Sequence, residues 1–441
     1  MRRPLELWMR RAASAVFVCG EKIFVIHRQN YLTSFPGYTA FPGGKVDKED
    51  SNKKAFHRIE GMENDILVAL SREMKEELGI DIDTEQIKVE HLGNALTPKF
   101  NPYRFDTFFF KIILKQEIDF NLDKQEFKGG EWVRPSVLLK EYEAGKILAV
   151  PPTVLLIKKL SENNGDKAPF DLNLKYDDQN EIPMIESVKG VKQFLPLSNT
   201  LPPANRTNCF LLGEEVLVDP SPCDENELKK LISSLEGFSI KSIFLTHHHP
   251  DHHENSVAIA KHFGAQFKMS KDSFERITKK WGASYFSDCK VSFVKEGDVL
   301  AKSCGYDVMA YAVPGHDEGQ LAPMREDKAW MIVGDLIQGV GTVVIGNDEG
   351  DMTKYFLSLE KVINLSPEVI FPSHGIGLGG VTYIEKTLKH RQMREEQVIK
   401  LLEQNKTPEQ MLSIIYTDID PALYPYALMN IHSHLKKINA K

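Results

Sequence analysis

The stretch Thr246-His-His-His-Pro-Asp-His-His253 places five histidines and one aspartate within eight residues, directly after the apolar run Ile243-Phe-Leu245. We interpret the apolar run as the end of a buried strand and Ser256-Val-Ala-Ile-Ala-Lys-His262 as the helix that follows. Turns from a strand to a helix are where α/β folds build binding sites. Histidine tracts of low complexity seldom include an acid at this spacing, so a metal site is favoured over a surface histidine patch.

Alternate side chains of an extended segment lie on the same side of the backbone. His247 and His249 are therefore expected to face one ion, and Asp251 and His252, beyond the bend at Pro250, to face a second ion.

The pattern His-x-His-x-Asp-His resembles the signature of the metallo-β-lactamase superfamily, and other parts of that family's pattern occur in order. Residues 208–220 resemble its opening hairpin, which ends on Asp219, and later matches are Pro314-Gly-His-Asp-Glu-Gly319, Val333-Gly-Asp335 and Phe371-Pro-Ser-His-Gly375. The resemblance implies two zinc ions or similar transition metals. It assigns His247, His249 and His316 to one metal, Asp251, His252 and His374 to the other, Asp335 to a bridging position, and Asp219 to the support of these ligands. Two such metals activate a shared water for hydrolysis, with Asp251 as a catalytic residue.

A second motif, Arg72-Glu-Met-Lys-Glu-Glu-Leu-Gly-Ile80, follows apolar residues at helical spacing and ends on Gly79, which is typical of a helix end. Glu73, Glu76 and Glu77 then share one face of the helix, where three like charges repel each other unless cations hold them. A solvated acidic face is the alternative interpretation. The upstream segment Phe41-Pro-Gly-Gly-Lys-Val46 favours a functional site.

Together these two segments resemble the Nudix box of hydrolases that cleave a nucleoside diphosphate linked to another group. The resemblance implies that Glu76 and Glu77 hold Mg²⁺ or Mn²⁺, that Glu73 is a ligand or the catalytic base, and that Arg72, Gly43 and Gly44 position the site. Asn64, at the end of a polar insertion, stands where a middle glutamate is usual, and its neighbours Glu63 and Asp65 could substitute for it. Either Glu126 or Glu131 could add a carboxylate from outside the helix.

Insertions of this kind, followed by Arg104-Phe-Asp-Thr107, Glu131-Trp132 and Pro151-Pro-Thr153, resemble the coenzyme A diphosphatase-like branch of Nudix enzymes. Coenzyme A or its esters are therefore candidate substrates of this part of the chain.

The chain has 441 residues, 55 basic and 62 acidic, and five scattered cysteines. This length predicts at least two cores, and the mild acidity argues against attraction of the whole chain to nucleic acid or membrane. The cysteines are odd in number and scattered, which predicts a cytoplasmic protein without a disulfide framework. The lack of a long apolar stretch predicts no membrane contact.

We expect an α/β chain of two domains, divided into a Nudix-like domain (1–160), a linker (161–190), a metallo-β-lactamase-like domain (191–380) and a helical tail (381–441). The resemblances imply an α/β/α sandwich with a mixed sheet, then a four-layer αββα sandwich. The tail resembles the small winged-helix-like tail of the lactamase-like protein 2 subgroup, which includes single-strand endoribonucleases. Because its charges nearly balance, a lid or homodimer contact is favoured over binding of single-stranded RNA.

These features predict a bifunctional metal-dependent hydrolase. The second domain is expected to hydrolyse a thioester, as in glyoxalase II, or a phosphodiester. The alternative is a single-strand endoribonuclease whose Nudix domain mainly binds a nucleotide ligand, and a third class has one domain without catalysis.

Overall fold

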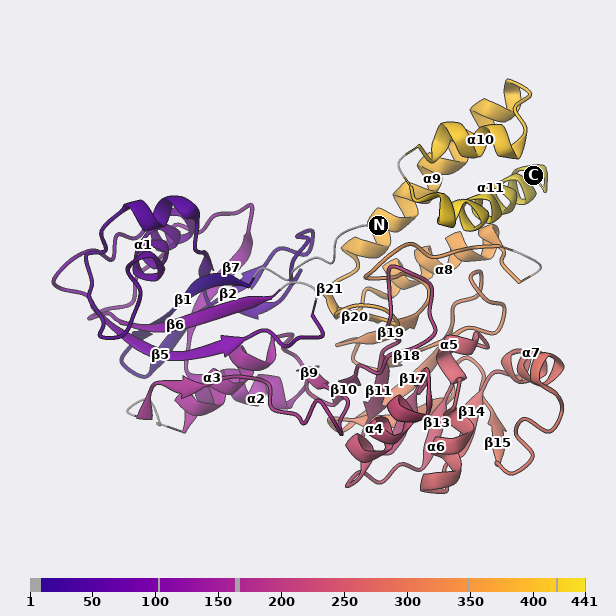
Figure 1. The fold of residues 1–441 in the computed structure, drawn as a ribbon, viewed down its shortest axis with the longest axis horizontal. Coiled ribbons are helices and arrows are strands. Elements are labelled where there is room, and N and C mark those ends of the chain that lie inside the picture. Colours follow the sequence, from indigo (N-terminus) through magenta and orange to yellow (C-terminus); the bar gives the residue numbers. More distant parts are fainter. Residues whose placement is uncertain (1–8, 102–103, 163–166, 347–348, 418, 441) are drawn as a thin grey trace. The chain divides into compact units, whose positions relative to one another are not determined.

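The computed structural model describes residues 9–101, 104–162, 167–346, 349–417 and 419–440. The chain forms two compact units (Figure 1). The first comprises the chain up to Tyr176 and Glu186–Lys189, and the second comprises Asp177–Ile185 and Gly190–Lys441. No helix within the described ranges combines the length and the apolar character that crossing a membrane requires.

The first unit is built on one mixed sheet, in which strands follow the order β3-β2-β1-β6-β5-β8, with β4 beside β1 and β7 beside β2. Strand β1 runs parallel to β6, whereas β2 and β4 pair with β1 in the antiparallel sense. The strands are β1 (Arg10–Cys19), β2 (Lys22–Arg28), β3 (Thr39–Ala40), β4 (Gly43–Lys45), β5 (Lys88–Leu96), β6 (Phe105–Ile113), β7 (Phe127–Val133) and β8 (Phe170–Asp171).

Helices cover both faces of this sheet, with α1 (Asn64–Leu78) on one face and α2 (Pro135–Glu143) and α3 (Pro151–Ser161) on the other (Figure 1). Successive residues of β1 point to opposite faces. Ala15 and Phe17 accordingly pack in the core beneath α1, and Val16 packs in the core beneath α2 and α3. A short 3-10 helix, η1 (Lys48–Asn52), precedes α1. The predicted α/β/α sandwich is confirmed.

The second unit contains two sheets. The first orders its strands β15-β14-β13-β12-β11-β10, and the second orders them β16-β17-β18-β19-β20-β21. The strands are β10 (Val191–Phe194), β11 (Cys209–Leu212), β12 (Val216–Val218), β13 (Ser242–Phe244), β14 (Gln266–Met269), β15 (Val291–Phe293), β16 (Val299–Ser303), β17 (Tyr306–Ala312), β18 (Leu321–Arg325), β19 (Met331–Gly334), β20 (Val369–Pro372) and β21 (Leu378–Gly379). Strand β9 (Met184–Val188) lies where the chain passes between the units.

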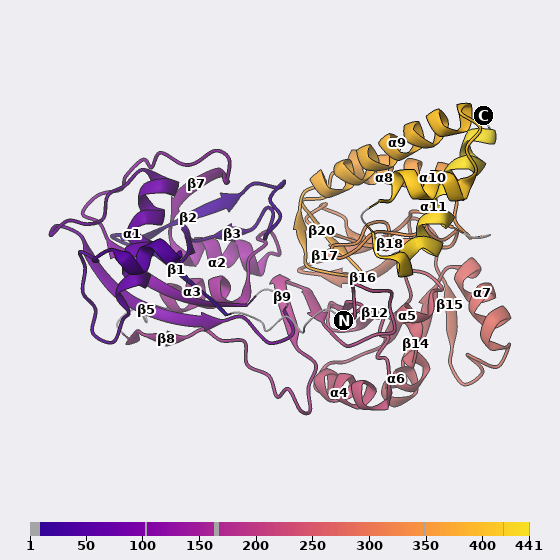
Figure 2. The same ribbon diagram turned by 45° about the horizontal axis from the view of Figure 1, so that its top comes forward.

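The two sheets of this unit face each other, and helices cover their outer sides (Figure 2). The rings of Phe210 on β11 and Phe371 on β20 meet between the sheets, 5.8 Å apart. The first sheet carries α4 (Glu225–Leu235), α6 (Ser256–Phe263) and α7 (Lys271–Trp281), and the second carries α8 (Met352–Leu365) and the start of α9 (Thr382–Glu403). The predicted αββα sandwich is confirmed.

The C-terminal tail is helical, as predicted, with α9 followed by α10 (Pro408–Ile415), the 3-10 helix η3 (Pro421–Leu423) and α11 (Tyr424–Asn439). Thr407 and Gln410 form a capping box at the start of α10.

The predicted linker 161–190 differs from the structure in one respect, because Phe170–Asp171 forms the edge strand β8 beside β5. The next residue, Leu172, is buried in the core of the first unit, so this part of the segment packs on the domain.

Candidate metal centre and carboxylate site

The predicted metal ligands of the second unit lie in loops that follow strands. His247, His249, Asp251 and His252 follow β13, His316 follows β17, Asp335 follows β19 and His374 follows β20. The helix α5 (Pro250–His253) begins at the proline, which is suited to a first helical position. Strands β12 and β13 are parallel, as are β19 and β20, so these loops emerge at a common edge of each sheet.

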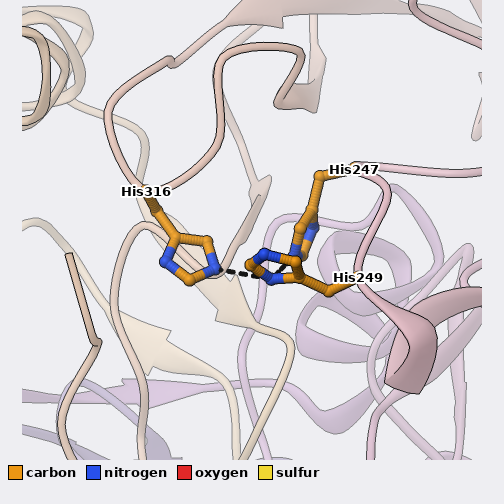
Figure 3. A group of neighbouring side chains, drawn as sticks. All are labelled: His247, His249 and His316. Carbon is orange, nitrogen blue, oxygen red and sulfur yellow. Dashed lines mark hydrogen bonds between the residues drawn. The ribbon is translucent and has the colours of Figure 1, made fainter. Parts of the chain in front are cut away.

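Three histidines form the first group, in which His249 Nδ1 lies 3.0 Å from Nε2 of both His247 and His316 (Figure 3). Two imidazole nitrogens at this distance share either a proton or a metal ion. The three facing nitrogens could therefore hold one ion.

The second group contains Asp251, His252 and His374. Asp335 lies between the two groups, because its Oδ1 is 3.7 Å from His252 Nε2 and 3.4 Å from His374 Nε2, while its Oδ2 is 3.8 Å from His316 Nε2. The structure thus brings all seven predicted ligands together in the predicted grouping.

Four of these histidines are held from behind through their Nδ1 atoms. The partners are Thr246 Oγ1 for His247 (3.0 Å), Asp219 Oδ2 for His252 (2.9 Å), the carbonyl of Val344 for His316 (2.9 Å) and the carbonyl of Arg206 for His374 (2.8 Å). Carbonyl and carboxylate oxygens only accept hydrogen bonds, and Thr246 Oγ1 donates its own hydrogen to Asp219. Nδ1 therefore donates in each case, and in the neutral ring the lone pair of Nε2 points toward the centre. Ligands of metals in proteins are commonly oriented in this way.

The centre leaves polar atoms that its own side chains do not satisfy. His252 Nε2, His374 Nε2 and Asp335 Oδ1 are buried and make no hydrogen bond within the described residues. Buried polar atoms are normally paired, because leaving them unpaired is costly. A divalent cation between the two groups would satisfy these atoms, so the residues present fit the implied metals.

The electrostatics of the two groups differ. Burial and the neighbouring His249 lower the pKa of His316 to about 4, which keeps its ring neutral and able to donate a lone pair. Burial opposes the charged form of His252, but Asp219 and Asp251 raise its pKa to about 10. In the absence of metal the second group therefore retains a proton that a cation would replace.

Asp219 supports the loop that carries the histidines. Its Oδ1 accepts from the Thr246 N–H at 2.8 Å, and its Oδ2 accepts from Thr246 Oγ1 at 2.6 Å and from His252. Asp219 adopts φ of 49°, a left-handed conformation that is uncommon for residues other than glycine and that concentrates at functional sites. This contact pattern matches the predicted supporting role.

In the first unit, two glutamates of α1 lie against the Gly43-Gly44 turn. The N–H of Gly43 donates to Glu77 Oε2 at 2.8 Å. A Cβ atom at Gly44 would lie 2.2 Å from Glu73 Oε1, so a larger residue at this position would displace the carboxylate from where it lies. Glu76 is exposed and accepts from Arg72 Nη1 at 3.1 Å.

Two carboxylates of α1 have raised pKa values because they are withdrawn from solvent. Burial, together with repulsion from Glu73, raises the pKa of Glu77 to about 8, and Glu126 adds to this repulsion. Burial also raises the pKa of Glu73. A cation would relieve this cost, although no three donor atoms of described residues in this unit lie as close together as those of the histidine clusters.

Comparisons with known proteins give the family of each unit. A family model of the NUDIX domain matches residues 9–150, one of the metallo-beta-lactamase superfamily matches 202–374, and one of the beta-lactamase associated winged helix domain matches 407–441. The chain contains a NUDIX domain and a metallo-β-lactamase domain. These two domains indicate a hydrolase, and both families typically bind divalent metals.

Curated relatives and solved structures are similar to parts of this chain. The beta-lactamase-like protein 2 homolog of Drosophila melanogaster is 26% identical over 251 residues, which cover 53% of this chain and 82% of that protein. The atrochrysone carboxyl ACP thioesterase of Aspergillus fumigatus is 24% identical, with 45% of this chain and 60% of that protein covered. The crystal structure of a beta-lactamase domain protein from Burkholderia ambifaria shares the fold, with a TM-score of 0.50, 20% identity, and coverage of 60% of this chain and 90% of that one.

In the NUDIX domain, Asp50 contacts Arg72, whereas none of the three residues weighed for the middle acidic position does so. The Arg72 guanidinium donates to both carboxylate oxygens of Asp50, at 3.1 and 3.0 Å, and Asp50 is fully buried. Glu63 and Asp65 instead pair with Arg11.

Asn64 holds the polar insertion, since it bonds the backbone of Lys53 and Ala55. Of these acidic and amide residues, Asp50 is therefore the one that the structure places against Arg72. The short distance of Asp50 from the Gly43-Gly44 turn was the available sequence signal.

The other open position of the NUDIX domain concerns the carboxylate from outside α1. Glu131 contacts His27 Nε2 at 3.2 Å, whereas Glu126 is among the charges that act on Glu77. The structure therefore favours Glu126.

One contact of a candidate metal ligand has no counterpart in the sequence pattern. Glu349 places one carboxylate oxygen 3.4 Å from His249 Nε2 and the other 3.3 Å from His248 Nε2. His248 is also paired with Asp317 through Nδ1. Glu349 thus contacts the ring nitrogen of His249 that is directed away from the centre, as the carbonyls do for His316 and His374.

Proposed function

We propose that this protein is a bifunctional metal-dependent hydrolase: the NUDIX domain cleaves a nucleoside diphosphate conjugate, and the metallo-β-lactamase domain hydrolyses a thioester. Coenzyme A esters contain both bonds, so one class of compounds would supply substrates for both domains. The observation that carries the second activity is the cluster of seven converging ligands with unsatisfied buried atoms at its centre. The similarity to a protein named as an acyl carrier protein thioesterase supports the thioester.

Two zinc ions or similar metals, when bound, would supply Lewis acidity toward the substrate oxygen and a nucleophilic water near neutral pH. The protein's contribution is to fix the ligands and to hold a proton. The Nδ1 hydrogen bonds of the histidines keep their Nε2 atoms directed at the centre. Asp251 is 17% exposed, more than Asp335 at 6%, so we assign to its Oδ2 the uptake of the proton that the attacking water loses.

In the NUDIX domain, Mg²⁺ or Mn²⁺ would neutralise the diphosphate. We assign Glu76 and Glu77 as its ligands and Glu73 as the ligand or base that the Gly44 turn admits. Arg72 holds Glu73 and Glu76 through one nitrogen while Asp50 fixes the rest of the guanidinium. The support for this activity is the Gly43 N–H bond that holds the buried Glu77, together with its raised pKa, because a cation beside this carboxylate would offset the cost of its burial.

The purified full chain should be tested on nucleoside diphosphate conjugates, acyl-coenzyme A thioesters and single-stranded RNA, with Mg²⁺, Mn²⁺ or Zn²⁺ supplied separately. We expect diphosphate cleavage with Mg²⁺ or Mn²⁺ and thioester hydrolysis with zinc. No hydrolysis of any diphosphate or thioester, by protein with its metals bound, would refute the proposal.

A single-strand endoribonuclease whose NUDIX domain mainly binds a nucleotide is the second candidate. The match of residues 407–441 to a winged helix domain favours it, because such domains often contact nucleic acid. RNA cleavage without thioester hydrolysis in the same assay would establish this alternative.

A further inference from the structure

The C-terminal tail contacts a segment of the metallo-β-lactamase domain, residues 343–345, through polar side chains. From α9, Arg391 donates to the carbonyl of Val343. From α11, Asn430 Oδ1 accepts from the N–H of Ile345 at 2.9 Å, and Ser433 Oγ donates to the carbonyl of the same residue at 2.7 Å. The tail thus bonds the backbone on both sides of Val344.

The remaining carbonyl of this segment faces the candidate metal centre. The carbonyl of Val344 accepts from His316 Nδ1 at 2.9 Å, and the Nε2 of the same ring is directed at His249. The position of the Val344 carbonyl therefore decides both which nitrogen of His316 carries hydrogen and where its lone pair points.

The polar residues that make these contacts are buried. Arg391 is 2% exposed, Asn430 is 5% exposed and Ser433 is 7% exposed. The apolar core of the tail includes Ile431, and none of these three polar residues belongs to it. Burying polar side chains is costly unless they are hydrogen-bonded, and each of these three residues bonds the backbone of residues 343–345.

We propose that the C-terminal helices are a positioning element of the metal centre: by holding residues 343–345 they fix the Val344 carbonyl and, through it, the metal-binding orientation of His316. This role rests on the proposed metal centre of the metallo-β-lactamase domain. It gives the tail a function within the chain itself, separate from any contact with RNA or a second copy. Asn430 and Ser433 act through the backbone and His316, so they are positioning residues.

The full-length variants Asn430→Ala, Ser433→Ala and the double variant test this role. Zinc affinity is measured by competition with a chromophoric chelator, and the ligand geometry by the visible spectrum of the cobalt-substituted protein. We expect about tenfold weaker zinc binding in the double variant, at the low end of the effects of supporting residues, and a changed cobalt spectrum. Ser433→Thr keeps the hydroxyl and should bind zinc as the parent does.

Ile431→Ala is the matched control, because Ile431 lies in α11, is 1% exposed and packs in the tail core without a bond to residues 343–345. It should lower thermal stability and leave zinc affinity unchanged at temperatures where the protein is folded. Equal losses of zinc in Ile431→Ala and in the double variant, or no loss in either, would overturn the inference.

If the double variant does not fold, the pair Ser433→Ala and Ser433→Thr decides the question alone, and unchanged affinity in Ser433→Ala would overturn the role. A parent protein that binds no zinc would instead refute the proposed metal centre, so the two failures are distinguishable.

Discussion

The side chain of Asp251 reaches the second group of ligands from the short helix α5, with its Oδ2 3.8 Å from His374 Nε2. Replacing Asp251 with alanine removes a ligand and the proposed proton acceptor. We expect hydrolysis by the metallo-β-lactamase domain to be abolished and bound metal to be reduced, while the fold survives because the side chain is partly exposed. Metal analysis and activity should be measured on the same sample, with His249→Ala in parallel. Full metal content and activity in both variants would show that the ligands are wrongly assigned.

Glu349 offers a second test at this scale, since its carboxylate stands behind His249. Glu349→Gln should weaken metal binding roughly 10-fold to 100-fold, as is typical when a residue that orients a metal-bound histidine is changed. The measurement is chelator competition, with Glu318→Gln as control, because Glu318 forms an exposed ion pair with Lys354 and is not among the candidate ligand groups of the described residues. Equal metal affinity in the two variants would show that Glu349 does not support His249 as a metal ligand.

The ligands of the metal centre could be predicted from sequence because each falls in a short motif beside a strand. Of the groups that orient them, Asp219 could be predicted from the family pattern, whereas Glu349 and the Val344 carbonyl could not. Glu349 is 100 residues from His249 in the chain, and the Val344 carbonyl belongs to the backbone, which carries no side-chain signal. Such contacts depend on how loops pack, and only the folded structure defines them.

Among the elements, α1 brings buried carboxylates together at a cost to stability. The pKa of Glu77 is raised by burial and by Glu73 from 4.5 to about 8. In metal-free protein, its contribution to the free energy of unfolding is therefore intact below the ordinary glutamate pKa, declines as pH rises toward about 8, and is lost above that value.

Glu77→Gln removes this dependence, so the variant should be more stable than the parent by an amount that grows across this pH range. Thermal unfolding with a chelator, at a pH near 4.5 and at a pH above about 8, measures the difference. A melting temperature that falls equally at both pH values on mutation would show that Glu77 stabilises the helix by packing.

The short helix η1 is the second element with a testable role, because Asp50 on it fixes Arg72. Asp50→Ala should lower diphosphate cleavage roughly 10-fold to 100-fold, since Arg72 positions Glu73 and small displacements of catalytic groups are costly. Asn64→Ala, which removes only contacts within the insertion, should retain the activity. Steady-state rates of diphosphate cleavage are compared for the two variants. A larger loss in Asn64→Ala than in Asp50→Ala would show that Asn64, and not Asp50, supports the site.

At the scale of the whole molecule, the two sandwiches followed from the two motifs, because each motif belongs to one fold. The strand β8 could not be predicted from the sequence, since two residues at a sheet edge leave no alternating pattern to recognise.

The two centres differ in ligand chemistry, and this difference predicts that their activities are separable. Oxygen ligands at Glu73, Glu76 and Glu77 should need exchangeable Mg²⁺ or Mn²⁺, whereas the histidine-rich centre should retain zinc or a similar metal through purification. Glu77→Gln should therefore silence diphosphate cleavage and leave the second reaction intact, and His247→Ala should do the reverse. Both reactions are measured on each full-length variant, with metal content determined. Loss of both reactions in either variant would contradict the independence of the two centres, because a ligand change in one domain would then impair the reaction of the other.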